Sequence, residues 1–176
     1  MNLNKLVQAS IFTASAIGAG FALLMVPNIE LISVIVFLAG MHLGIPWGIL
    51  IGGTAEMIFS GLNPIGSGLT FPPLFIFQIL GMAFIGFSGG FLGNYFLRKK
   101  FSIFQVVTLG ATGFFLTLIF DSLTTLSYPI SAGFDLSRTI GLYISGIGFT
   151  ILHQVSNAVI FAAGVPRVTK YLVKKD

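Results

Sequence analysis

The chain has 176 residues, of which 55% are hydrophobic, only 8% are charged and 22 are glycines. Soluble globular domains usually carry about a quarter charged residues, so this composition excludes an ordinary water-soluble domain and indicates a membrane protein. The formal net charge of +4 is small and its basic residues are segregated along the chain, which is typical of membrane orientation and not of a nucleic-acid surface. Cysteine is absent, which excludes disulfide bonds and thiolate metal sites.

Six apolar segments, separated by proline, asparagine, glycine and the few charged residues, predict six helices. A helix that crosses a hydrocarbon layer of ~30 Å needs about 20 residues. The predicted spans cover residues 5–25, 29–45, 47–61, 73–97, 103–126 and 139–165. They use nearly the whole chain, so we expect a single all-α, polytopic membrane domain over residues 1–176, with six transmembrane helices in one compact bundle.

The basic residues predict which side of the membrane each connection faces. Eight of the nine lysines and arginines are Lys5, residues 98–100 and the four in the tail that begins at Arg167. With six spans these positions share one side, and the positive-inside rule places that side, with both termini and the 98–102 loop, in the cytoplasm. The expected outer loops are residues 26–28, 62–72 and 127–138.

Small residues recur every four positions in the first predicted segment. Ser10, Ala14 and Gly18 form one stripe, along which another helix can approach closely. The stripe predicts either packing within the chain or contact with a partner subunit. Ala16 and Gly20 offer a second register for the same pattern.

Common catalytic and phosphate-binding motifs are absent from the sequence. It has no G-x-x-x-x-G-K-[ST] phosphate loop and no H-E-x-x-H zinc motif, and its two histidines, His42 and His153, lie on different predicted helices. The glycine pairs at 52–53 and 89–90 lie inside apolar segments, where we expect close helix packing and no phosphate binding. We therefore expect no enzyme activity, no metal site and no cofactor.

Three carboxylic acids in the predicted spans need a reason to be there, because an ionised side chain at the bilayer centre costs about 2.5–3.5 kcal/mol. Glu56 falls near the expected midplane, where it is either a ligand contact or a hydrogen-bonded structural carboxyl. Glu30 and Asp121 fall near the expected outer ends of their helices. At each position, contact with water explains the carboxylate as well as contact with a ligand does.

The sixth predicted segment carries polar residues on one face. Steps of three and four residues place side chains on the same side of a helix, so we expect this face to line a cavity. Its members are Tyr143, Gly146, Thr150, His153 and Asn157. Gln78, near the outer end of the fourth segment, is expected to meet the same cavity, although a lone His or Gln can equally serve an interhelical hydrogen bond. The other candidate binding residues, in or beside the outer loops, are Asn28, Asn63, Tyr128 and Arg138.

Charge near these candidates bears on the ligand. Four acids face the outer half or the midplane, namely Glu30, Glu56, Asp121 and Asp135. Only Arg138 opposes them, and Asp135 is close enough in sequence to pair with it. A polyanionic ligand would be repelled, so we expect a neutral or cationic small heterocycle.

Several local motifs accompany the six spans and the basic tail. They are Ser10-x-x-x-Ala14-x-x-x-Gly18, Pro27-Asn28-Ile29-Glu30-Leu31, Asn63-Pro64-Ile65-Gly66 and Pro72-Pro73. With them the chain resembles, over essentially its whole length, the substrate-binding S components of energy-coupling factor transporters. The first motif is similar to the Ala-x-x-x-Ala coupling stripe of that family, with Ser10 in place of the first alanine.

The resemblance implies a multi-pass subunit of a prokaryotic cell membrane that captures a vitamin or vitamin precursor from outside with high affinity. Transport then requires a transmembrane coupling subunit, which would contact Ser10, Ala14 and Gly18, and two cytoplasmic ATPase subunits. The resemblance also implies a pocket in the outer half, walled by helices four to six and closed by the first and second outer loops. The residues that match these elements by position are Gln78, Asp121, Tyr143, His153 and Asn157. A metal substrate is not expected, because Met1-Asn2-Leu3-Asn4 lacks the histidine of the cobalt and nickel members.

Two other functions fit the same residues. A stand-alone permease or proton-coupled carrier would use Glu56 and His153 as proton sites. A structural or assembly protein of the membrane would bind no ligand at all.

Overall fold

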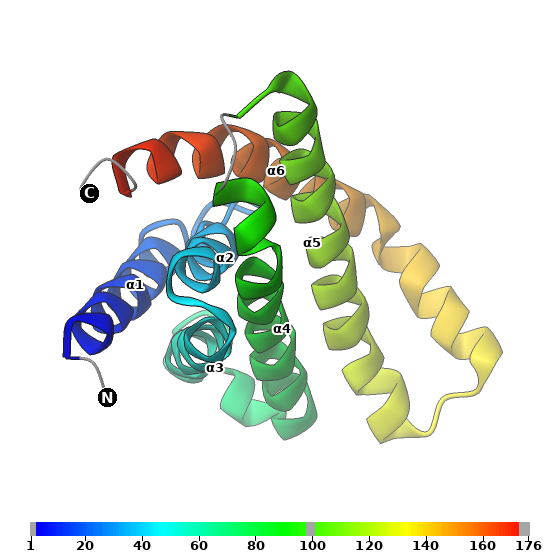
Figure 1. Cartoon of the computed structure of the whole chain (residues 1–176). Helices are drawn as coiled ribbons and strands as arrows, with labels where there is room; N and C mark the ends of the chain where they lie inside the picture. The colour runs from blue at the N-terminus through cyan, green and yellow to red at the C-terminus, as the bar shows by residue number, and fades with distance from the viewer. Residues whose placement is uncertain (1–2, 98–100, 173–176) are drawn as a thin grey trace.

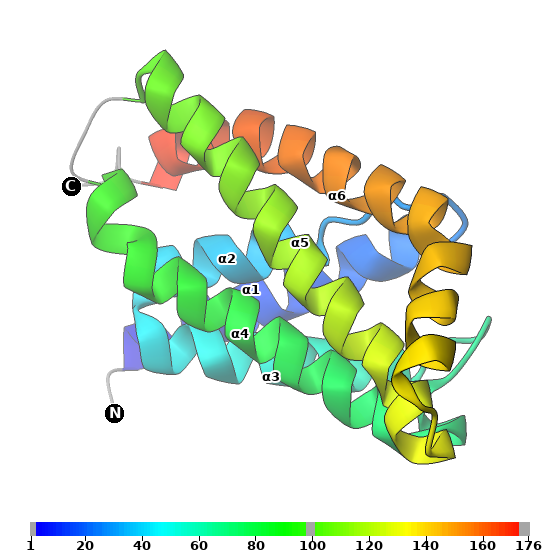
Figure 2. The ribbon, with the colours of Figure 1, turned by 90° about the vertical axis from the view of Figure 1, so that its right-hand side faces the viewer.

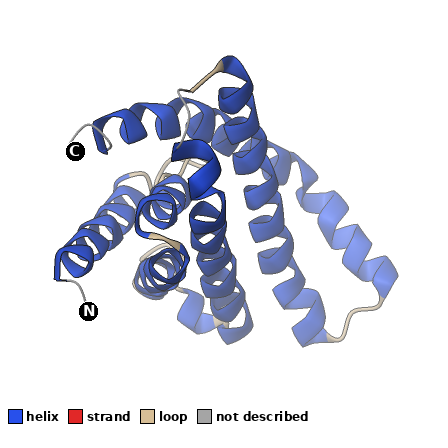
Figure 3. Ribbon diagram, viewed as in Figure 1, coloured by secondary structure: helices blue, strands red, loops and turns tan. Residues whose placement is uncertain are grey.

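The computed structural model describes residues 3–97 and 101–172 of the chain (Figure 1). Within these residues the chain forms α-helices and one short 3₁₀ helix, and no strand (Figure 3). In chain order they are α1 (Leu3–Ala22), α2 (Ile32–Leu43), α3 (Ile45–Gly61), η1 (Gly68–Thr70), α4 (Pro72–Leu97), α5 (Ile103–Ala132) and α6 (Leu136–Leu172). The prediction of an all-α chain with six helices is confirmed within the described residues, and three of these helices are long and apolar enough to cross a membrane. The basic residues at 98–100 and 174–175 lie outside the described residues.

Local sequence signals explain several helix ends. Ser102 and Gln105 form a capping box at the start of α5, in which each side chain accepts a hydrogen bond from the backbone N–H of the other residue. Gly133 ends α5 in the left-handed conformation, at φ 64°, which a glycine adopts without strain. Gly44, at φ 94°, is the single residue between α2 and α3. It turns the chain back so that these two helices form an antiparallel pair.

Successive helices run in opposite directions, so the connections collect at two ends of the molecule. Figure 2 shows the connections 23–31, 62–71 and 133–135 gathered at one end. The starts of α1 and α5 and the ends of α4 and α6 lie at the opposite end. This is the grouping of connections that the basic residues predict.

Helix lengths differ from the predicted spans in both directions. By length and composition α4, α5 and α6 are each able to cross a membrane. With 12 residues α2 rises only about 18 Å, so the predicted continuous span 29–45 is wrong in its extent. The cause is local: residues up to Leu31 form turns, and Gly44 ends the helix. In contrast, α5 continues through Pro129 to Ala132, six residues past its predicted end.

Glycines allow α2, α3 and α4 to pack backbone against backbone. A Cβ atom added to Gly86 on α4 would overlap the carbonyl group of Gly48 on α3, and one added to Gly89 would overlap that of Phe37 on α2. Gly52 likewise faces the carbonyl of Met82. The expectation that the 52–53 and 89–90 pairs serve helix packing is confirmed for Gly52, Gly89 and Gly90, which meet backbone atoms of neighbouring helices, whereas Gly53 has only ordinary contact with a side chain.

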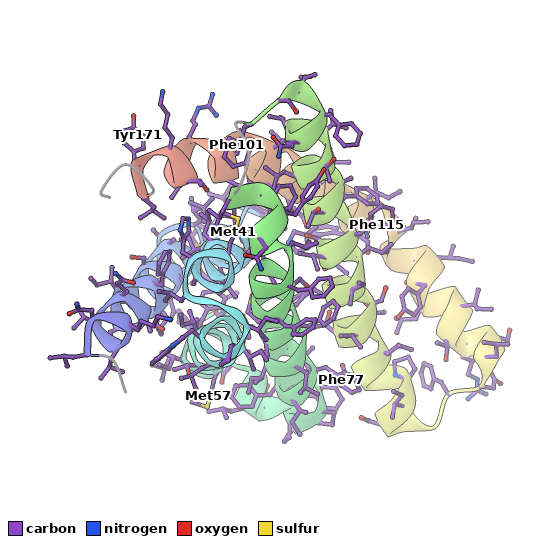
Figure 4. All side chains as sticks on the ribbon, viewed as in Figure 1. Met41, Met57, Phe77, Phe101, Phe115 and Tyr171 are labelled. Carbon is purple, nitrogen blue, oxygen red and sulfur yellow. The ribbon has the colours of Figure 1, made fainter. Side chains whose placement is uncertain are left out.

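Apolar side chains also cover the outside of the molecule. Phe115 on α5 and Tyr171 on α6 point away from the other helices (Figure 4), and both are more than half exposed. Such an outer surface suits lipid and would be unfavourable in water. The long apolar helices and this surface indicate a multi-pass membrane protein.

Candidate functional site

The connection between α1 and α2 brings a carboxylate to the middle of α6. Asn28 adopts the left-handed conformation, at φ 59°, which asparagine tolerates better than most residues. Two residues later, Glu30 Oε2 accepts a hydrogen bond of 2.9 Å from the backbone N–H of Ser33 in the first turn of α2. Its other oxygen, Oε1, accepts one of 3.0 Å from Nδ2 of the fully buried Asn157. Glu30 therefore ties the connection between α1 and α2 to α6.

A second polar link joins α5 to α6. The Nδ1 atom of His153 lies 2.9 Å from Oδ1 of Asp121, and the two side chains are 19% and 14% exposed. With Nδ1–H donated to the carboxylate, the neutral ring carries its lone pair on Nε2. Asp121 Oδ2 is buried and has no hydrogen-bond partner within the described part of the chain.

Two cavities adjoin these links and share Asn28 and His153 in their walls. The first, of about 160 Å³, lies between α5 and α6, and polar and apolar groups contribute about equally to its surface. We call it the polar cavity, because every residue that lines it except Phe149 has a polar side chain. Its further lining residues are Asp121, Thr124, Thr125, Phe149 and Thr150. The second, of about 230 Å³, lies beneath the connection between α1 and α2, and apolar groups dominate it. Its apolar side chains are Leu23, Leu24, Val26, Pro27, Ile29 and Phe59, and Glu30 also reaches its wall.

The candidate residues nearest these cavities come from three separate parts of the sequence. Asn28, Glu30, Asp121 and His153 line one or both cavities, and Asn157 holds Glu30 from behind. Of the residues predicted on one face of α6, Thr150 and His153 line a cavity, whereas Tyr143, Gly146 and Asn157 do not. No sequence pattern indicates the link between Glu30 and Asn157.

Other candidates on the long helices have partners elsewhere. Gln78 Oε1 accepts a hydrogen bond of 2.6 Å from the Ser60 hydroxyl, and Gln78 lines neither cavity. The Tyr143 hydroxyl donates one of 2.6 Å to the carbonyl of Ser122, which joins α6 to α5 beside the polar cavity without lining it. Glu56 is 3% exposed, interacts electrostatically with Glu30 and also lines neither cavity.

The candidates predicted in loops lie at the end of the molecule that holds the connections 23–31, 62–71 and 133–135. The predicted loop 127–138 is wrong in its extent, because α5 continues to Ala132 and α6 begins at Leu136, which places Tyr128 and Arg138 on helices. Asn63 Oδ1 accepts a hydrogen bond of 3.0 Å from the backbone N–H of Ile65 and so closes a turn. The Tyr128 ring lies 6.2 Å from that of Phe71, so α5 contacts the connection 62–71. Arg138 forms an exposed ion pair of 3.9 Å with Asp135.

Several cavity residues were not among the predicted ones. Thr124 and Thr125 follow Asp121 by three and four residues, so helical spacing alone would have placed them on its face. Phe59 lies on α3 in an apolar run, and no sequence signal separates it from ordinary core residues.

The two registers of the small-residue pattern on α1 have different surroundings. Ala16 and Gly20 are buried, and a Cβ atom on Gly20 would crowd Ile32 and Phe59, so this register packs within the chain. In contrast, Ser10, Ala14 and Gly18 are exposed. Ser10 and Ala14 line a groove of about 370 Å³ between α1 and α3, whose other wall includes Trp47, Leu50 and Thr54.

No protein-family model, curated protein or solved structure matches the chain. Within residues 3–97 and 101–172 there is also no group of three or more His, Cys, Asp or Glu side chains placed to hold a metal ion. The function is therefore inferred from the cavities, the residues that line them and the arrangement of the helices.

Proposed function

We propose that this chain is the substrate-capture subunit of an ATP-driven micronutrient importer of the energy-coupling factor type. The observation that carries the proposal is the pair of adjoining cavities that share Asn28 and His153, closed on one side by the connection between α1 and α2. Carboxylates within membrane helices are rare and often mark a ligand or ion pathway, so the placement of Glu30 and Asp121 at the cavities supports a binding role.

The orientation that we propose places these cavities in the outer half of a prokaryotic cell membrane. Lys5, Arg167 and Lys170 lie at the end of the molecule opposite to the connections 23–31, 62–71 and 133–135. The positive-inside rule assigns that basic end to the cytoplasm. In this orientation all six helices pass between the two sides, and the shortest of them, α2, is shielded from lipid by its neighbours, with most of its residues buried.

Energy for uptake would come from other polypeptides. The sequence carries no phosphate loop, and the exposed stripe Ser10, Ala14 and Gly18 offers a smooth surface to a helix of a coupling subunit. That subunit would connect the chain to two cytoplasmic ATPases. We propose a neutral or cationic heterocycle as cargo, because Glu30 and Asp121 lie at the cavities and their linings contain no lysine or arginine.

The experiment that tests this function combines ligand identification with reconstituted uptake. The chain is purified in mild detergent, its co-purified small molecules are identified by mass spectrometry, and a panel of vitamins is tested for thermal stabilisation. The identified compound is then offered to vesicles that contain either the chain alone or the chain purified together with its membrane and ATPase partners. We expect uptake only with the partners and ATP. Absence of any bound or stabilising small molecule would favour an assembly protein instead.

A proton-coupled carrier is the second candidate, and the buried Glu56 with the Asp121–His153 pair favours it. It predicts uptake into vesicles that contain the chain alone, driven by a pH gradient and abolished by Glu56→Gln. Under the capture-subunit proposal the lone chain moves no substrate under any gradient, so the same vesicles separate the two functions.

A further inference from the structure

We propose that the two cavities hold a single two-part ligand, with an N–H-donating, positively charged head of the amidine class between α5 and α6 and an apolar group beneath the connection between α1 and α2. This inference rests on the proposed function only in treating the cavities as a binding site. It adds which chemical group enters which cavity.

The sizes of the cavities favour one ligand that spans both. Ligand pockets in proteins usually measure about 300–1,000 Å³. The polar cavity, of about 160 Å³, and the apolar cavity, of about 230 Å³, each fall below that range, whereas the two together lie within it. Both have Asn28 and His153 in their walls, so a ligand that occupied the two cavities would lie against these side chains where the cavities adjoin.

Most polar groups around the smaller cavity have already used their protons. The hydroxyl of Thr124 donates to the carbonyls of Phe120 and Asp121, and that of Thr150 donates to the carbonyl of Gly146. Each hydroxyl oxygen is left as an acceptor. With the His153 ring neutral and its Nδ1–H donated to Asp121, Asn28 and Thr125 are the lining residues that can still offer donors. The cavity is therefore better suited to a ligand that brings hydrogens of its own.

Asp121 gives the polar cavity its charge preference. Its Oδ1 atom is engaged by His153, while its buried Oδ2 has no partner within the described residues. A buried acceptor without a partner is costly. A charged N–H donor that reaches the Asp121 carboxylate from the polar cavity would satisfy it with one of the stronger hydrogen bonds that proteins form. With Glu30 in the wall of the neighbouring cavity and the His153 ring neutral, the two carboxylates near the ligand favour a cation and repel an anion.

The second cavity supplies the complementary apolar half. Leu23 and Leu24 from the connection and Phe59 from α3 enclose a space in which a ring or alkyl group loses contact with water. Glu30 is held at its edge by Ser33 and Asn157, so its two oxygens already have donors. Of the two carboxylates, only that of Asp121, in the wall of the polar cavity, therefore has an oxygen without a donor within the described residues.

Three small probes test the two halves separately: benzamidine carries both groups, acetamidine carries the head alone, and benzoate pairs the same ring with an anion. Their binding to the purified, ligand-stripped chain in detergent is measured by calorimetry. We expect benzamidine to bind more tightly than acetamidine, and benzoate not to bind. Equal binding of benzoate and benzamidine, or no binding of benzamidine at millimolar concentration, would overturn the proposal.

Variants assign each probe group to its cavity. We expect Asp121→Asn to weaken benzamidine binding by about tenfold or more and to relax the rejection of benzoate. Phe59→Ala should weaken benzamidine and leave acetamidine unchanged. Thr117→Val is the matched control, because Thr117 is buried on the same helix as Asp121 and lines neither cavity. Unchanged benzamidine binding by Asp121→Asn contradicts the assignment.

The identity of the co-purified ligand separates this inference from the proposed function. If the chain delivers a captured compound with ATP and that compound is an anion, the two-part inference and the proposed class of cargo fail, whereas the ATP-driven capture function stands. If benzamidine binds as expected but no compound is taken up with the partners present, the function fails and the assignment of the cavities stands.

Discussion

Glu30 shows how one side chain can serve both a helix end and a tertiary contact. One carboxylate oxygen accepts the Ser33 backbone N–H and the other accepts the Asn157 amide, across 127 residues of sequence. A negative charge at the start of α2 also suits the helix dipole. The capping hydrogen bond is local, whereas the contact with α6 closes the site.

Replacing Asn157 tests how much its hydrogen bond to Glu30 contributes to stability and ligand binding. In Asn157→Leu the half-buried Glu30 carboxylate loses a donor, and the loss of a partner from a fully buried group typically costs about 1–3 kcal/mol, so we expect a cost in the lower part of that range. We expect a lower thermal unfolding midpoint in detergent and weaker ligand binding. The double variant with Glu30→Gln should lose less than the sum of the single losses, because both changes act on one hydrogen bond. Strictly additive losses would show that the two residues do not act together.

The spacing of residues in the sequence accounts for only part of the site. Helical periodicity predicts that His153 and Asn157 share one face of α6. It would also have placed Thr124 and Thr125 on the same face of α5 as Asp121. The pairings of Asp121 with His153 and of Gln78 with Ser60 depend on how helices pack, which spacing within one helix does not encode. For the same reason the predicted meeting of Gln78 with the α6 residues has no counterpart at either cavity.

At the scale of elements, α4 is held by backbone contacts that only glycine permits. We expect Gly86→Ala to destabilise the fold strongly, because its Cβ would overlap the Gly48 carbonyl and force α3 and α4 apart. Overpacking typically costs about 1–3 kcal/mol, and a clash with backbone belongs at or above the top of that range. Thermal unfolding in detergent measures the loss. Gly18→Ala is the control, since no atom lies within 4 Å of its added Cβ. Equal stability of both variants would contradict this packing.

The exposed stripe on α1 gives a second prediction at this scale. Ala14→Trp should block assembly with the coupling subunit, because a bulky ring on a smooth surface prevents close helix approach. Ligand affinity should be nearly unchanged, since Ala14 lines neither of the two adjoining cavities. Ser15→Trp is the matched control, because it places the same ring on a neighbouring exposed face of α1 that is not part of the stripe. Recovery of the full complex by affinity purification from the Ala14→Trp strain would identify the stripe as ordinary surface.

The sequence predicts that the six helices exist far better than it predicts where each one begins and ends. Runs of apolar residues between polar breaks predict the six long helical segments. The ends of the helices depend on single residues. Pro129 predicts a break, yet α5 continues through it and Pro129 itself is buried. Just before it, the Ser127 hydroxyl donates a hydrogen bond to the carbonyl of Thr124. The short length of α2 follows from Gly44 and from turns that hydropathy does not resolve.

At the scale of the whole molecule, orientation is the claim on which the outward-facing site depends. The absence of cysteine allows single cysteines to be placed without background labelling. Exposed positions exist at both ends of the molecule: Ile65 lies among the outer connections, and Pro46 and Lys170 lie at the basic end. Pro46 directly follows the tight junction of α2 and α3, so it reports on whether the shortest helix carries the chain across.

We expect a membrane-impermeant maleimide to label Ile65→Cys in intact cells, because this loop would face outward. Pro46→Cys and Lys170→Cys should be labelled only after the membrane is permeabilised, since both would face the cytoplasm. Labelling of Pro46→Cys in intact cells with Lys170→Cys protected would mean that α2 does not cross, which breaks the six-span arrangement. Reversal of all three results would turn the cavities toward the cytoplasm, and capture from outside would then be impossible.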